Sequence, residues 1–271
     1  MEQTNQVTQQ PFFQYKTTII DAPLPSLGKI YPFGSPLNKK ESVSIREMGT
    51  KEEDILSTLS LMRGGKAVDM VLKNCILEKE IEPDKLVIGD RNSLVIALVL
   101  ASYGSSYNAD VSCPYCGEIN SKYEFSLSRL PIKNLPVEPV KEGENEFKYI
   151  LPRSAAEITF KLLLSEDDRE INEIVEKLKK TTTNYTKEAA IEQNSSFRLK
   201  KQILSINGER DRNKITSVID NNLLPILDST SLRNYIDEIS PKIDTTQEFK
   251  CRECSKVNKV NIPISAEFFW R

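Results

Sequence analysis

The chain has 271 residues, which allows one large domain or two small ones, and its hydrophobic content of 39% is enough for a folded core. Its 37 Lys and Arg residues nearly balance 39 Asp and Glu residues, and a net charge of −2 argues against a global basic field for nucleic acid or an anionic membrane. The sequence contains no histidine, which excludes Ser-His-Asp catalysis, Cys-His catalysis and histidine-ligated metal sites.

Residues 1–15 are polar and rich in glutamine, and we expect them to form an N-terminal arm with no core of its own. A Pro-Phe-Phe sequence at 11–13 favours docking to a partner. The segment lacks the basic and apolar regions of a signal peptide, and no apolar run approaches the ~18–20 residues that span a bilayer. We therefore expect a protein made in the cytosol, with no membrane partner.

Residues 16–130 are expected to form an N-terminal lobe. Alternation in "ESVSIRE" predicts a strand, and the spacing of apolar residues in "KEEDILSTLSLM" and over 66–78 predicts helices. Next, "DRNSLVIALVLASYG" contains eight consecutive apolar residues and predicts a helix buried on every side, with Asp90 and Ser93 as capping candidates. Cys75 lies near the apolar side of its helix, which favours a buried apolar residue over a metal ligand.

Residues 131–146, rich in proline and charge, are the best candidate for a linker, and 147–271 are expected to form a C-terminal lobe. Strands are predicted in "EFKYILP" and "EITFKLLL", followed by a helix in "SEDDREINEIVEKLKK" and further helices over 187–206, 211–224 and 228–240. The aromatic run Phe268-Phe269-Trp270 follows, and it either caps the lobe that carries the cysteine pairs or anchors a partner.

The two lobes share a pattern. Asp90 precedes Cys113 by 23 residues, and Asp228 precedes Cys251 by the same 23. Serine and leucine recur at matching offsets, and each half predicts a helix, a strand, a Cys-x-x-Cys turn and a second strand. We infer a helix-rich, pseudo-duplicated chain of the α+β class with small antiparallel sheets, although chance agreement among common signals is the alternative.

Four of the five cysteines form two Cys-x-x-Cys turns between predicted strands. Such a turn brings two thiolates about 3.5–4 Å apart, which fits two corners of a zinc tetrahedron. Without histidine, a closed site needs both pairs, so we predict one structural Zn²⁺ in a zinc-ribbon-like clamp whose ligands are Cys113, Cys116, Cys251 and Cys254. A redox pair, free thiols and an iron–sulfur cluster are the alternatives. Flanking strands argue against the redox pair, which usually opens a helix. Four protein ligands leave no open position for catalysis.

With these residues in order, the chain resembles the baseplate hub assembly protein family of T4-type contractile-tailed bacteriophages. The resemblance rests on "LPSLGKIYP", "VSIREMGTKEEDIL", "GDRNSLVIALVLASYGSSY", "CPYCG", the second Cys pair and "FFW". It implies a non-enzymatic role in the hub and wedge region of the tail baseplate, either in the virion or as an assembly factor in the host cytoplasm. The implied partners are other tail proteins, with no small-molecule substrate. The sequence departs from the family pattern in "CRECS", where a glycine is expected after the second cysteine.

A nucleic-acid-binding zinc ribbon is the alternative function. Basic residues cluster near the second Cys pair, but Glu248 and Glu253 interrupt them. A ribbon that binds nucleic acid should instead present a basic face with exposed aromatic residues. The residues behind this alternative are Lys250, Arg252, Lys256 and Lys259. We therefore expect no nucleic-acid partner.

Overall fold

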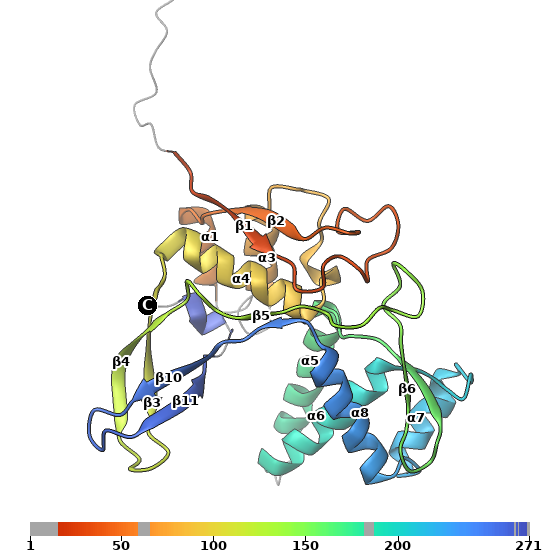
Figure 1. The fold of residues 1–271 in the computed structure, drawn as a ribbon. Helices are drawn as coiled ribbons and strands as arrows, with labels where there is room; N and C mark the ends of the chain where they lie inside the picture. The colour runs from red at the N-terminus through yellow and green to blue at the C-terminus, as the bar shows by residue number, and fades with distance from the viewer. Residues whose placement is uncertain (1–15, 59–65, 182–186, 263, 265, 270–271) are drawn as a thin grey trace, which may run out of the picture.

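The computed structural model describes residues 16–58, 66–181, 187–262, 264 and 266–269. Over these residues, helices combine with antiparallel sheets of two or three strands, so the expected α+β class is confirmed (Figure 1). The Pro-Phe-Phe sequence at 11–13 and Trp270 lie outside the described residues. Residues 16–130 are termed the N-terminal half, and residues 147–271 the C-terminal half.

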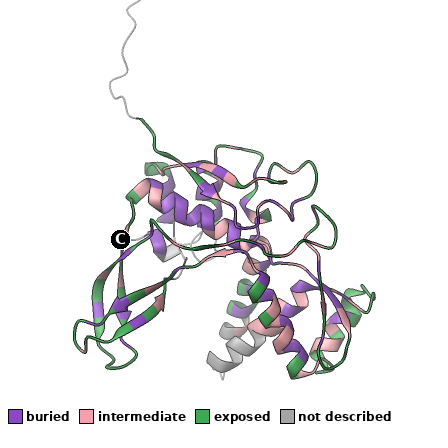
Figure 2. Ribbon diagram, in the orientation of Figure 1, coloured by how far each residue is buried: buried purple, intermediate pink, exposed green. Residues whose placement is uncertain are grey.

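The N-terminal half surrounds one buried helix. Its elements are β1 (Ile19–Pro23), β2 (Ser42–Arg46), α1 (Thr50–Leu56), α3 (Lys66–Cys75), the 3-10 turn η1 (Pro83–Lys85), α4 (Ile88–Tyr103), β3 (Ser106–Ser112) and β4 (Ile119–Ser126). Helix α4 is buried along most of its length, as its apolar run predicts (Figure 2). Strands β1 and β2 pair antiparallel beside it, and β3 and β4 form a hairpin that extends away from it (Figure 1).

The capping role predicted for Asp90 is wrong. Helix α4 begins at Ile88, which places Asp90 at its third position, fully buried. The Asp90 carboxylate accepts hydrogen bonds from the Ser26 N–H (2.9 Å), the Ser26 hydroxyl (2.5 Å) and the Tyr31 hydroxyl (2.6 Å). It therefore fixes the loop after β1 to α4. Ser93 does not cap α4 either, because its hydroxyl donates to the Pro23 carbonyl.

The C-terminal half combines a three-stranded sheet, a group of helices and a second hairpin. Its elements are β6 (Phe147–Ile150), β7 (Glu157–Phe160), α5 (Ser165–Thr181), α6 (Lys187–Gln202), β8 (Ile203–Ile206), α7 (Arg212–Asp220), α8 (Ile226–Ile239), β9 (Lys242–Ile243), β10 (Thr246–Lys250), β11 (Val257–Asn261) and the 3-10 turn η2 (Ala266–Phe269).

The helix predicted over 187–206 is wrong in its last four residues, which form β8 instead. There Ile203 and Ser205 are buried while their neighbours are less so, and β8 pairs with β7.

Residues 131–146 contact both halves. Within them, β5 (Ile132–Lys133) pairs antiparallel with β9 of the C-terminal half. The Leu135 N–H donates to the Pro25 carbonyl (2.9 Å) in the N-terminal half, and the Leu135 side chain is buried. This segment therefore packs along the fold between its two halves (Figure 1).

The contact made by Asp90 recurs in the C-terminal half. Asp228 is the third residue of α8, and its carboxylate accepts from the Arg153 N–H (2.7 Å) and the Ser154 N–H (3.0 Å). Those residues follow β6 after a Leu-Pro pair, just as Ser26 follows β1 after a Leu-Pro pair. Each half thus attaches the loop after its first strand to the start of its main helix.

Three further contacts also recur. A basic residue near the end of the second strand pairs with an acid in the first turn of the next helix, and that acid accepts the N–H of the residue before the helix. These sets are Arg46, Glu52 and Gly49 in one half and Lys161, Asp167 and Leu164 in the other. Near the ends of α4 and α8, the hydroxyls of Ser102 and Ser240 each donate to the carbonyl four residues earlier.

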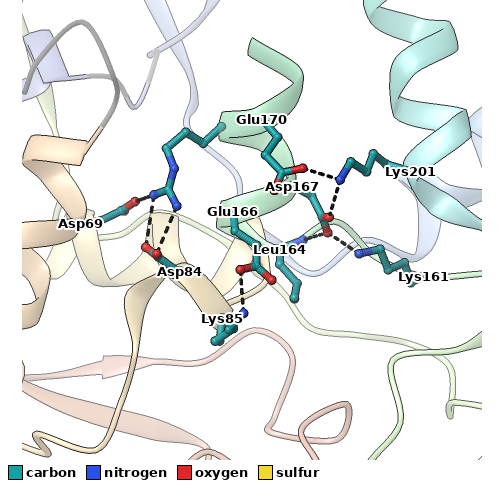
Figure 3. A network of polar contacts seen from close by, with 10 residues as sticks. Asp69, Asp84, Lys85, Lys161, Leu164, Glu166, Asp167, Glu170 and Lys201 are labelled. Atoms are coloured by element: carbon teal, nitrogen blue, oxygen red, sulfur yellow. Dashed lines mark hydrogen bonds and ion pairs between the residues drawn. The ribbon is translucent and has the colours of Figure 1, made fainter. Parts of the chain in front are cut away.

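Ion pairs connect the two halves beside α4 (Figure 3). The Arg169 guanidinium on α5 bonds to Asp69 (2.9 Å) on α3 and to Asp84 (3.1 Å) on η1, and Lys85 pairs with Glu166 (2.6 Å). The Arg169 guanidinium lowers the pKa of Asp84, although burial opposes it. One hydrophobic core runs through both halves and includes Phe268.

Candidate metal centre

The two hairpins bring the four predicted thiols together. Cys113 and Cys116 lie in the turn from β3 to β4, and Cys251 and Cys254 lie in the turn from β10 to β11. The hairpins lie side by side (Figure 1), with Sγ–Sγ distances of 3.6 Å from Cys113 to Cys254 and 3.7 Å from Cys116 to Cys251. All four sulfurs lie within 4.8 Å of one another.

These distances fit one tetrahedral ion. A Zn–S bond of about 2.3 Å implies a sulfur–sulfur edge of about 3.8 Å. The spacing is far too long for a disulfide bond, whose S–S distance is about 2.0 Å. The four sulfurs therefore form a possible metal site that joins both halves.

Backbone hydrogen bonds shape both turns in the same way. The N–H of Cys113 donates to Glu118 O (2.8 Å) and that of Cys251 to Lys256 O (3.0 Å). The residue after each second cysteine has a left-handed conformation, with φ of 75° at Gly117 and 59° at Ser255. The serine in "CRECS" thus adopts the conformation that glycine adopts in "CPYCG".

Replacing Ser255 with glycine is expected to stabilise the protein by about 1 kcal/mol, because a non-glycine residue is strained at this φ. The matched substitution Gly117→Ser should destabilise it by a similar amount. Chemical unfolding midpoints of the two variants test this pair. Shifts of the same sign would contradict the assignment.

Two buried asparagines, which the sequence reasoning missed, connect the hairpins. Asn120 Nδ2 donates to Cys251 Sγ (3.5 Å), and Asn258 Nδ2 donates to Cys113 Sγ (3.7 Å). The Asn120 Oδ1 also accepts the Arg252 N–H (2.8 Å). Each asparagine thus supports a sulfur of the opposite hairpin. The sequence signal was available, because both motifs read Cys-x-x-Cys-x-x-x-Asn.

Asn120→Ala is expected to weaken metal binding about 10–100-fold, the usual effect of removing a group that supports a metal ligand. Competition with a chromogenic chelator measures the affinity. Ser121→Ala, one residue further on and exposed, is the control and should leave it unchanged. Wild-type affinity in Asn120→Ala would contradict the supporting role.

The turns also alter the acidity of the thiols. The backbone N–H of Cys254 lowers the pKa of Cys251 to about 6 against the effect of burial, and the Asn120 amide adds to this. Burial raises the pKa of Cys113, but the N–H groups of Cys116 and Tyr115 outweigh it, so the pKa is lowered. Although the Glu118 N–H lowers the pKa of Cys116, burial and the neighbouring sulfurs raise it to about 12. These shifts favour a state in which only some of the four thiols are ionised. A bound cation would offset the negative charge of further thiolates.

Cys75 lies apart from this group. It is fully buried at the end of α3, and burial raises the pKa of its thiol to about 11. The structure thus places it as an apolar core residue rather than in the four-sulfur group.

The four thiols would suit a cation with a structural role. Two of the sulfurs, those of Cys113 and Cys251, belong to buried residues, and each half of the fold supplies two of the four thiols. Among the described residues, no helix is both long and apolar enough to cross a membrane. Fold and site together define an α+β protein whose halves meet at a four-cysteine cluster.

Comparison with protein families identifies the family to which this chain belongs. Residues 24–270, nearly the whole chain, match the family described as T4 bacteriophage base plate protein. The chain belongs to that family, so it is a phage baseplate structural protein that interacts with other tail proteins in the virion tail. Comparisons with curated proteins and with solved structures gave no match.

Proposed function

We propose that the chain is a non-enzymatic component or assembly factor of the baseplate hub and wedge region, and that one structural zinc ion stabilises it. On this proposal, lobes 16–130 and 147–271, joined by the linker 131–146, are fastened by Cys113, Cys116, Cys251 and Cys254. The main support is the meeting of two thiol pairs from distant parts of the sequence. Four thiolates at tetrahedral spacing favour zinc. They also leave no position for a substrate, as suits a structural part.

The free energies of loop closure and of zinc binding support a metal link between the halves. Closing the loop between Cys116 and Cys251 costs a few kcal/mol of chain entropy under the logarithmic rule. A structural zinc site contributes about 10–16 kcal/mol at neutral pH. The ion would therefore outweigh the closure cost.

Elemental analysis of protein purified without added metal tests the ion. We expect one zinc per chain, and its removal by a chelator should lower the thermal unfolding temperature. Iron at the site, or a chain free of metal with unchanged stability in chelator, would reject the zinc proposal.

The role in the particle needs a separate experiment. Mass spectrometry of purified tails is compared with a pull-down of the tagged chain from infected cells. Presence in finished tails identifies a structural component, whereas capture with tail proteins only during infection identifies an assembly factor. Absence from both would reject the baseplate role.

Two contacts weigh against the alternative of a nucleic-acid-binding ribbon. The Arg252 guanidinium lies over the Tyr123 ring (5.8 Å to its centroid), and the Lys256 ammonium lies over the Tyr115 ring (4.2 Å). These basic groups therefore interact with the aromatic residues that a nucleic acid would use. A shift of labelled DNA or RNA at low salt would favour the alternative.

A further inference from the structure

An aliphatic patch is exposed where α8 begins. Leu223, Ile226 and Leu227 are 66%, 74% and 53% exposed. They lie in the loop before α8 and in its first turn. These three residues are termed the α8 patch. Three large aliphatic side chains exposed within five residues form a local apolar patch, the kind of feature that marks interaction sites.

Two of the three equivalent residues, Ile88 and Gly89 of α4, are covered by the C-terminal half. At the offset that relates Cys113 to Cys251, Ile226 corresponds to Ile88. The Ile88 N–H donates to the Leu163 carbonyl (3.2 Å), and the Ile88 side chain packs against a cluster of Leu163, Ile171 and Val175. The corner between β7 and α5 therefore covers the first residue of α4.

A second segment covers the next residue of α4. Gly89, which corresponds to Leu227, lies against the chain that follows α8. A Cβ atom at Gly89 would lie 1.8 Å from the Pro241 carbonyl oxygen, so the backbones touch. The start of α4 is thus covered by the β7–α5 corner and by the end of α8.

The N-terminal half presents the same two segments at its surface. Met48, in the corner between β2 and α1, corresponds to Leu163 at the offset that relates Arg46 to Lys161. Tyr103, at the end of α4, corresponds to Pro241 at the offset that relates Cys113 to Cys251. They are neighbours, because the Met48 N–H donates to the hydroxyl of Ser102 (2.9 Å). Gly49 and Thr50 are exposed, and Tyr103 is 43% exposed. Met48, Gly49, Thr50 and Tyr103 are termed the β2–α1 surface.

We propose that the α8 patch of one chain docks on the β2–α1 surface of a second copy, in a contact related to the one that joins the halves within one chain but wider at Leu227, which replaces Gly89. Ile226 then lies against Met48. The Leu227 side chain packs on Tyr103 and holds the two backbones further apart than Gly89 and Pro241. The Ile226 N–H is one of the first four helix amides, which have no partner within the helix. It would donate to the Met48 carbonyl, as Ile88 donates to Leu163.

This contact is heterologous, because each chain uses two different surfaces. Such contacts build a closed ring or an open filament rather than a symmetric dimer. It also lacks an equivalent of the ion pair between Lys85 and Glu166, because Leu223 and Lys51 occupy the matching positions. We therefore expect association that persists in high salt. This contact between copies does not involve the four-cysteine cluster.

Sedimentation and light scattering of the metal-loaded full chain, over a range of micromolar concentrations, test the proposal. We expect the wild-type mass to rise with concentration to multiples of the 30.8 kDa chain. Ile226→Glu and Tyr103→Glu should each remain monomeric. Val140→Glu, which changes an equally exposed aliphatic residue (56%) outside both surfaces, should assemble like the wild type.

A mixture of the two variants that cannot assemble alone tests the contact most directly. Each retains one intact surface, so an equimolar mixture of Ile226→Glu and Tyr103→Glu should form dimers and nothing larger. A monomeric wild type, or a mixture that stays monomeric, would overturn the proposal. Circular dichroism checks folding. Ile226→Ser replaces Ile226→Glu, and Tyr103→Ser replaces Tyr103→Glu, if the charged variant fails to fold.

Discussion

Cys251→Ser is expected to abolish metal binding and to separate the two hairpins. The Cys251 side chain is buried and bonds to the Asn120 amide of the opposite hairpin, so its loss removes one donor and one link. A structural zinc site contributes about 10–16 kcal/mol, comparable to the total stability of a domain. Zinc content should fall from one per chain to near zero. Thermal unfolding should shift to a much lower temperature and lose its cooperativity between the halves. Cys113→Ser, the equivalent change in the first hairpin, should act alike.

Cys75→Ala provides the matched control. It removes a buried thiol outside the four-sulfur group, and it should reduce stability modestly while zinc stays at one per chain. Elemental analysis and calorimetry of the three variants give both quantities. Unchanged zinc content in Cys251→Ser would show that the four sulfurs do not act as one site.

Asp90→Ala is expected to destabilise the protein by about 3–5 kcal/mol. The substitution removes three hydrogen bonds and leaves the Ser26 N–H and the Tyr31 hydroxyl buried without their acceptor. Both donors belong to buried residues, so water does not readily replace the carboxylate. Denaturant unfolding monitored by circular dichroism measures the change in free energy.

Two further variants calibrate that effect. Tyr31→Phe removes one of the three bonds and also the acceptor of the buried Val87 N–H (3.2 Å), and should cost about 2–3 kcal/mol. Asp21→Ala removes an exposed carboxylate that accepts from Ser44, and should change stability by less than about 0.5 kcal/mol. Equal effects for Asp90→Ala and Asp21→Ala would show that the loop after β1 is not fixed through Asp90.

The sequence predicted the elements whose periodicity is strong. Helix α4 and the strands on both sides of each Cys pair follow directly from apolar runs and alternation. The matching of two Cys-x-x-Cys turns to one site was predictable because, without histidine, neither turn can close a tetrahedron alone. Proximity of all four sulfurs agrees with that reasoning.

Other features depend on contacts that a linear pattern does not reveal. Aspartate is a residue type that often caps helices, so the sequence suggests that role for Asp90. Its hydrogen-bond partners, however, lie 64 and 59 residues earlier, in a loop that only the folded chain brings near. Strand β8 continues the sequence of a helix and becomes extended because β7 offers a pairing edge. The asparagines behind the sulfurs escaped notice because polar residues near a turn usually face solvent. The C-terminal aromatic residues illustrate the same limit: Phe268 and Phe269 are both buried, and the Phe268 ring packs against Tyr107 of the first hairpin (4.8 Å).

The sequence separation of the two hairpins affects synthesis on the ribosome. Cys251 is translated 135 residues after Cys116, a delay of roughly 7 to 27 s at 5–20 residues per second. During that interval the nascent N-terminal half carries two thiols without their complementary pair. It is then most open to oxidation or to capture by another thiol, and cellular conditions in those seconds influence how much of the chain matures.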